Sequence, residues 1–107
     1  MKRYAFTIHL KKEKYDLYRK LHSKPWQKVL DSLRINNVKN YSIFYRDGNL
    51  FSYYEYCGNN HEKDMANIAN DPITQQWWNL TKPCQEPMPS AGKKEWWAPM
   101  LEVFHMD

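Results

Sequence analysis

The stretch 38-VKNYSIFYRDGNLFSYYEYC-57 decides the fold of this chain. Two runs rich in aromatic and β-branched residues, 38–46 and 49–57, flank the pair Asp47–Gly48. Such runs favour β-strands, and an Asp-Gly pair between them is among the strongest short signals for a two-residue hairpin turn. The centre of the chain is therefore predicted to be a β-hairpin.

The segment before the hairpin predicts one strand and two helical segments. Residues 3–10 alternate between large apolar side chains and polar or small ones, which is typical of a strand. In residues 12–24 the apolar side chains recur at the spacing of one helix face, which predicts a helix. Pro25 interrupts this helix, and the stretch 25–37 predicts a second helical segment that ends at Asn36–Asn37.

The segment after the hairpin predicts two more helical segments and a last strand. Residues 59–70 have an Asn N-cap candidate and one apolar side, and Asp71–Pro72 opens another helical turn. Prolines at 83, 87 and 89 break this helix into a loop. Residues 99–106 read as strand four.

The element order βαββαβ predicts an α+β fold of the ferredoxin-like class, with an antiparallel sheet and both helical layers on one face. The length of 107 residues suits a single domain, 1–107. The strands carry large side chains on both faces, so the face without helices needs a cover. We expect a second copy of the chain to supply it, which predicts a homodimer, a dimeric α/β barrel.

Composition restricts the class of protein. The net charge of +4 is only mildly basic, and the charges are interleaved as on solvated helix faces. No apolar run approaches the length that spans a membrane, and the N-terminus has no apolar leader segment. Cys57 and Cys84 form no CxxC pair, which favours a reducing compartment. We expect a cytoplasmic protein without a membrane partner.

Known patterns for metals, nucleophiles and phosphates are missing from the sequence. None of the four histidines stands in an HExxH pattern, no serine lies in a nucleophile elbow, and three glycines are too few for a phosphate loop. We therefore expect no metal and no cofactor. This inventory fits chemistry that needs only the movement of protons.

Tyr18 and His22 are the first candidates for a site. At i and i+4 they are neighbours on one helix face, and histidine can serve as a general acid or base near neutral pH. From spacing alone, the pair can equally be packing at the edge of the core. Trp26, beyond Pro25, reads as a core residue.

The tryptophan pairs are the second candidates. Trp77 and Trp78 lie about 100° apart on a helix, so one can pack while the other lines a pocket or an interface. A tryptophan ring stacks well on the apolar face of a sugar or a base. Trp96 and Trp97, in the loop before strand four, read as interface residues.

The predicted topology and the basic balance of charge resemble those of an RNA recognition module. That module needs glycines and basic residues on its third strand. Here the third strand is NLFSYYEYC, which lacks both and carries Glu55. We therefore expect no nucleic-acid partner.

Four blocks of the sequence together resemble the L-rhamnose mutarotase family. They are YRKLHSKPW at 18–26, NYSIFYRDGNLFSYYEY at 40–56, DPITQQWW at 71–78 and EVFHMD at 102–107. Two departures from the family pattern are Ser23–Lys24–Pro25 directly after His22, and the early end of the last helix at Pro83–Cys84.

The resemblance implies an isomerase that interconverts the α and β anomers of L-rhamnose, or of a related 6-deoxy sugar such as L-fucose, without a cofactor. It implies that His22 is the proton donor and that Tyr18, Tyr41, Trp77 and Trp78 contact the sugar. Two alternatives stay open at the level of sequence. One is a dimeric-barrel monooxygenase that degrades haem or oxidises quinols, and the other is a non-enzymatic module that binds sugar or RNA.

Overall fold

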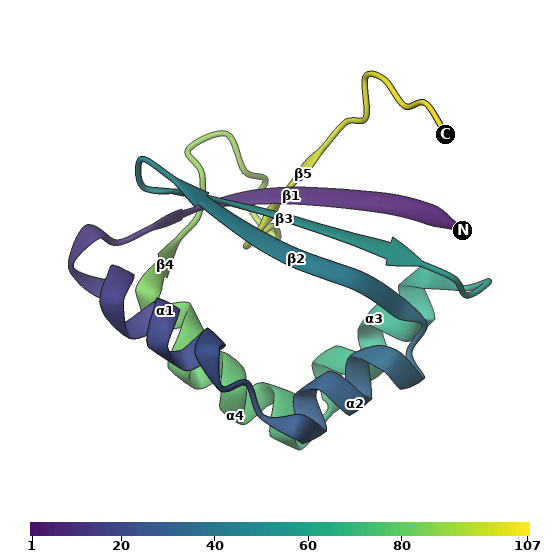
Figure 1. Cartoon of the computed structure of the whole chain (residues 1–107), viewed down its shortest axis with the longest axis horizontal. Helices are drawn as coiled ribbons and strands as arrows, with labels where there is room; N and C mark the ends of the chain where they lie inside the picture. The colour runs from purple at the N-terminus through teal and green to yellow at the C-terminus, as the bar shows by residue number, and fades with distance from the viewer.

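The computed structural model describes residues 1–107, and a five-stranded sheet forms its upper layer (Figure 1). The strands are β1 (Lys2–Leu10), β2 (Val38–Arg46), β3 (Asn49–Tyr56), β4 (Gln85–Glu86) and β5 (Ala98–Met100). The sheet order is β2-β3-β1, and both β4 and β5 pair with the other edge of β1. Every pair is antiparallel, so the predicted α+β fold with an antiparallel sheet is confirmed.

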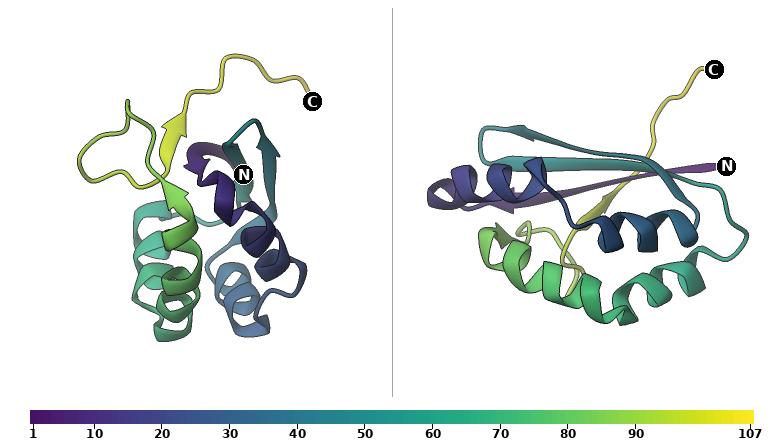
Figure 2. Two further views of the ribbon diagram at one scale, coloured as in Figure 1. Left: turned by 90° about the vertical axis from the view of Figure 1, so that its left-hand side faces the viewer. Right: turned by 60° about the horizontal axis from the view of Figure 1, so that its bottom comes forward.

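Four helices cover one face of this sheet (Figures 1 and 2). They are α1 (Tyr15–Ser23), α2 (Gln27–Ile35), α3 (His61–Asn70) and α4 (Pro72–Thr81), with short 3₁₀ turns at Lys12–Lys14 and Lys82–Cys84. The break predicted at Pro25 is confirmed, because it separates α1 from α2. None of the helices is long and apolar enough to cross a bilayer.

The central hairpin forms as predicted. Asp47 and Gly48 both have positive φ, 50° and 83°, which is the geometry of the two-residue turn that matches the twist of the strands. Tyr45 then pairs with Leu50, and Phe44 with Phe51. Phe44 and Phe51 stand on the face without helices, where Phe44 is 62% exposed.

A β-bulge in β2 was not predicted, and it determines where Tyr41 points. Lys39 pairs with Glu55 and Ser42 with Tyr53, so Asn40 and Tyr41 together oppose a single residue. Asn40 has the left-handed φ of 50° that such an extra residue needs. Without the bulge, strict alternation would send Tyr41 to the face opposite Val38. With it, the side chain of Tyr41 lies on the helix-covered face.

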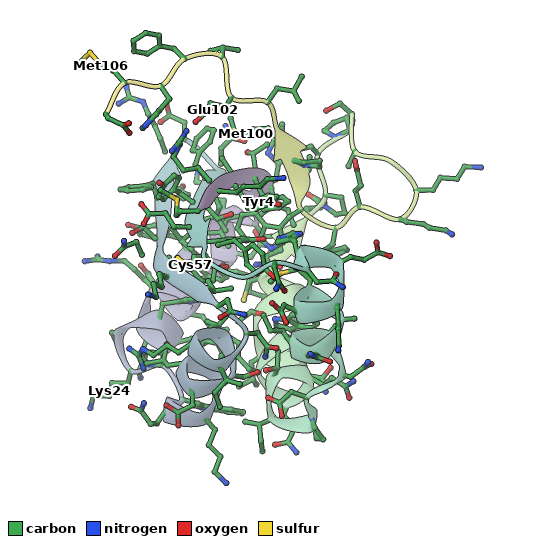
Figure 3. The ribbon with its side chains drawn as sticks, turned by 90° about the vertical axis from the view of Figure 1, so that its right-hand side faces the viewer. Tyr4, Lys24, Cys57, Met100, Glu102 and Met106 are labelled. Atoms are coloured by element: carbon green, nitrogen blue, oxygen red, sulfur yellow. The ribbon has the colours of Figure 1, made fainter.

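The prediction of a fourth strand over 99–106 was wrong in its extent. Only Ala98–Met100 pairs with β1, at Ala5–Thr7. Residues 101–107 leave the sheet and run away from the body of the subunit, where the labelled Met106 projects into solvent (Figures 2 and 3). The tail does not continue the strand because its apolar side chains meet no surface of the same subunit: Val103 is 96% exposed. An ion pair of 2.7 Å between Arg3 and Glu102 connects the beginning of this tail to β1.

The core consists of two clusters of buried side chains between the sheet and the helices. One contains Ile8, Leu10, Tyr18, Leu50 and Cys84. The other contains Val38, Tyr54, Tyr56 and Ile68. A cavity is lined by members of both clusters, so the space between the two layers is not fully packed.

Candidate active site

A cavity of about 1080 Å³ lies between the helix-covered face of the sheet and the helices. Its volume lies just above the range of ~300–1000 Å³ for pockets that enclose small ligands. Hydrophobic residues make up 17 of the 24 that line it, which suits a ligand with apolar faces. All five residues predicted for the site line this one cavity: Tyr18, His22, Tyr41, Trp77 and Trp78.

Helix α1 brings Tyr18 and His22 together as their spacing predicted. Their ring centroids are 4.3 Å apart, and Nδ1 of His22 lies 2.8 Å from the backbone carbonyl oxygen of Tyr18. A carbonyl oxygen can only accept a hydrogen bond, so Nδ1 carries a proton and donates it. In the neutral ring, Nε2 is therefore the nitrogen with a free lone pair.

The charge of His22 is set mainly by burial. Burial lowers the pKa of its imidazole, because removal from water disfavours the charged form. The hydrogen bond to the carbonyl of Tyr18 opposes this shift, although it is the smaller effect. The ring is thus mostly neutral at pH 7, with Nε2 ready to take up a proton.

Helix α4 supplies the tryptophans. Asp71 caps its start by accepting from the backbone N–H of Thr74, 3.1 Å, and Pro72 occupies the first turn. Trp77 is buried and meets His22 edge to face, with ring centroids 5.3 Å apart. Trp78 is half-buried, and the ammonium group of Lys82 lies 5.0 Å from its ring centroid.

The two tryptophans of α4 differ in burial, but both line the cavity, so they do not divide into one packing residue and one pocket residue. Trp77 packs, and it also lines the cavity beside His22. Trp26 is half-buried, lies edge to face against Trp77 at 5.4 Å, and does not line the cavity. Trp26 belongs to neither cluster of buried core residues, so the prediction that it is a core residue was wrong, although it packs against Trp77.

Tyr41 enters the cavity from the sheet. Its ring meets Tyr54 edge to face, with centroids 5.8 Å apart. The residue as a whole is 43% exposed, yet burial of its hydroxyl end raises the pKa of Tyr41 to about 12. Burial also raises the pKa of Tyr18, and the nearby phenol of Tyr41 contributes to that increase. Both hydroxyls therefore stay protonated at any pH in which the protein works.

Three residues of the site were not predicted as such. Tyr54 on β3 lines the cavity, and its hydroxyl lies 2.7 Å from Nε2 of His61. Gln85 on β4 donates to the hydroxyl of Tyr18, and Trp96 donates to Gln85. Within the subunit Trp96 packs against the first core cluster, and its expected place at an interface stays a prediction. No sequence signal marks Gln85, because its contact with Tyr18 spans 67 residues.

Chemically, the cavity offers an acid-base group, several hydroxyls, those of Tyr18 and Tyr41 among them, and large apolar ring faces. No group of three or more His, Cys, Asp or Glu side chains in the structure could hold a metal ion. The residues suit a small polar ligand with one apolar face whose reaction needs proton exchange. A monosaccharide has these properties.

Comparison with known proteins shows which family the chain is related to. The family model described as L-rhamnose mutarotase matches residues 3–106. L-rhamnose mutarotases of Phocaeicola vulgatus and Oceanobacillus iheyensis are 36% and 31% identical to the chain, and each match covers 100% of both chains. The crystal structure of an L-rhamnose mutarotase from Formosa agariphila superimposes over 100% of both chains with a TM-score of 0.78 and 25% identity. The chain belongs to the L-rhamnose mutarotase family.

Proposed function

We propose that this chain, an isomerase of the sugar mutarotase type, interconverts the α and β anomers of L-rhamnose, with His22 as the catalytic residue. The observation that carries the proposal is the environment of His22. Its Nε2 atom is free for a ligand in a cavity that Tyr18, Tyr41, Trp77 and Trp78 also line. A related 6-deoxy sugar such as L-fucose offers the same functional groups.

The reaction is a balanced exchange of protons. The bond between C1 and the ring oxygen breaks, the anomeric hydroxyl releases one proton, and the ring oxygen takes up one. The aldehyde then rotates, and the reverse steps close the ring on the other face. Neutral His22 accepts the proton of the anomeric hydroxyl at Nε2 when the ring opens and returns it as imidazolium when the ring closes, so in this scheme it begins as the base and not as the proton donor that the family resemblance implies. Water, or a relay through the hydroxyl of Tyr18, exchanges the second proton.

The aromatic side chains hold the sugar in place. The ring of Trp77 or Trp78 stacks on the apolar face of the sugar and its methyl group. The hydroxyls of Tyr18 and Tyr41 stay protonated and bind sugar oxygens. The residues that bind the sugar thus lie on α1, β2 and α4, three elements that the fold brings to one cavity.

Saturation-transfer NMR tests this function directly. Irradiation of one anomeric proton of L-rhamnose reduces the signal of the other only if the anomers exchange quickly, and L-fucose is measured in parallel. We expect His22→Asn to keep the fold and to reduce the exchange rate by about 10²–10⁴-fold, the usual effect of losing a positioned acid or base. Exchange at the wild-type rate in this variant would overturn the role of His22.

The monooxygenase alternative is not favoured, because the relatives that match over the full chain are mutarotases. The unpaired thiols of Cys57 and Cys84 suit the reducing cytoplasm, where we place the enzyme.

The working unit is a homodimer in which the open faces of two sheets meet. Phe44 and Phe51 are exposed opposite one another on this face. The apolar side chains of the C-terminal tail are exposed too: Leu101, Val103, Phe104 and Met106. Exposed apolar surface of this extent favours a protein partner, and a second copy of the chain supplies one by two-fold symmetry.

A further inference from the structure

A buried chain of hydrogen bonds runs from Trp96 through Gln85 to Tyr18 in the cavity wall. The indole Nε1 of Trp96 lies 2.7 Å from Oε1 of Gln85, and Nε2 of Gln85 lies 3.0 Å from the hydroxyl oxygen of Tyr18. Gln85 is only 5% exposed. Water is thus largely excluded from the amide, and protein groups satisfy both of its ends.

Donor and acceptor rules fix the direction of this chain. An indole N–H can only donate, so it must face the carbonyl end of the Gln85 amide. The NH₂ end then faces Tyr18 and can only donate as well. The hydroxyl oxygen of Tyr18 is therefore an acceptor here, and its own hydrogen is not used in any hydrogen bond within the protein.

The two neighbouring groups of α1 consequently have opposite hydrogen-bonding character. Tyr18 has a hydrogen to donate, and neutral His22 has a lone pair on Nε2 to accept. A hemiacetal carbon carries the matching pair: a hydroxyl that can donate, and a ring oxygen that can only accept. The fixed direction of the hydrogen bonds thus suits a sugar held with its ring oxygen toward Tyr18.

We propose that Gln85, held by Trp96, is a positioning residue that makes the hydroxyl of Tyr18 a hydrogen-bond donor to the ring oxygen of the sugar. This inference rests on the proposed function for its ligand. Gln85 does not touch the reacting atoms and moves no proton. It sets the direction of one hydrogen bond, which strengthens as negative charge develops on the ring oxygen.

Four variants test the proposal. Gln85→Leu removes the donor, and we expect kcat/KM for anomer exchange to fall by roughly 3- to 10-fold. Gln85→Glu replaces the donor with a carboxylate that accepts from Tyr18. The hydroxyl hydrogen of Tyr18 is then no longer available to the sugar, and we expect a larger fall in kcat/KM, roughly 10- to 100-fold. Trp96→Phe removes the N–H that fixes the Gln85 amide, so the amide can rotate and present its oxygen to Tyr18. We expect an effect on kcat/KM like that of Gln85→Leu. Trp97→Phe is the matched control, because Trp97 packs against the same core cluster without a hydrogen bond to Gln85.

A spectroscopic measurement tests the direction without any sugar. Tyrosine labelled with ¹³C at Cζ gives one signal per residue, and Tyr18→Phe identifies that of Tyr18. A phenol that donates to a carboxylate moves toward phenolate character, so we expect this signal to move downfield in Gln85→Glu. We expect it to stay at the wild-type position in Trp97→Phe. Thermal unfolding identifies any variant that has lost its fold.

The outcomes separate the two proposals. Wild-type exchange rates in folded Gln85→Glu and Trp96→Phe would overturn the role of Gln85 while leaving the mutarotase function intact. An unmoved Tyr18 signal in Gln85→Glu would overturn it as well. Absence of anomer exchange in the wild-type protein would instead overturn the proposed function, and the Cζ signals would still report whether Gln85 donates to Tyr18.

Discussion

The carbonyl oxygen of Tyr18 accepts a hydrogen bond from Nδ1 of His22, one turn later in α1, across 2.8 Å. This contact determines which nitrogen of His22 reacts. Because Nδ1 keeps its proton in both charge states, all proton exchange with a ligand takes place at Nε2. The orientation of the ring thus follows from the local geometry of one helix.

The pH dependence of the reaction follows from the environment of this ring. Burial lowers the pKa of His22 below its ordinary value of 6.5, and the proposed reaction begins with the neutral form. We expect kcat/KM for anomer exchange to be constant at and above neutral pH and to fall as the pH drops through the lowered pKa. Exchange rates measured across pH, together with ¹⁵N shifts of His22, test this. A midpoint above 6.5, or a proton on Nε2 at pH 7, would contradict it.

The two tryptophans of α4 are expected to respond differently to truncation. Trp77 is buried against His22 and Trp26, so Trp77→Ala should lower the free energy of unfolding by about 3–5 kcal/mol. Trp78 is half-buried, so Trp78→Ala should cost less stability and mainly raise KM for the sugar. Urea unfolding and exchange kinetics measure both effects. Equal stability losses in the two variants would refute this division.

The bulge at Asn40 makes a third prediction possible. Asn40 has φ of 50°, which costs a β-branched residue about 1–2 kcal/mol and glycine nothing. We expect Asn40→Val to be less stable than Asn40→Gly by this amount, and to raise KM because Tyr41 turns away from the cavity. Asn40→Gly is the matched control, since both variants lose the hydrogen bond from Asn40 to Glu55, 2.7 Å. Equal unfolding midpoints for Asn40→Val and Asn40→Gly would show that the positive φ at position 40 does not limit stability.

Local rules predicted the part of the site that local structure forms. Tyr18 and His22 meet because four residues make one helical turn, and the hairpin forms because Asp47–Gly48 suits its turn. Gln85 depends instead on a contact across 67 residues, which no short pattern encodes. The inward direction of Tyr41 depends on one extra residue in β2, and a bulge leaves only a weak mark in a sequence.

The C-terminal tail provides a test of the homodimer. Val103 and Phe104 are 96% and 79% exposed in the single subunit, so Val103→Ser with Phe104→Ser removes little contact within it and should leave subunit packing unchanged. In a dimer that covers these side chains, burial of a Val or Phe is worth about 1.5–3 kcal/mol each, so we expect the dissociation constant to rise by at least about 10²-fold. Analytical ultracentrifugation over a dilution series measures it. Lys93→Ser with Lys94→Ser, also exposed, is the matched control. If the wild-type chain sediments as a monomer, or if the tail variant dimerises as tightly as the control, then the tail does not lie in an interface between subunits.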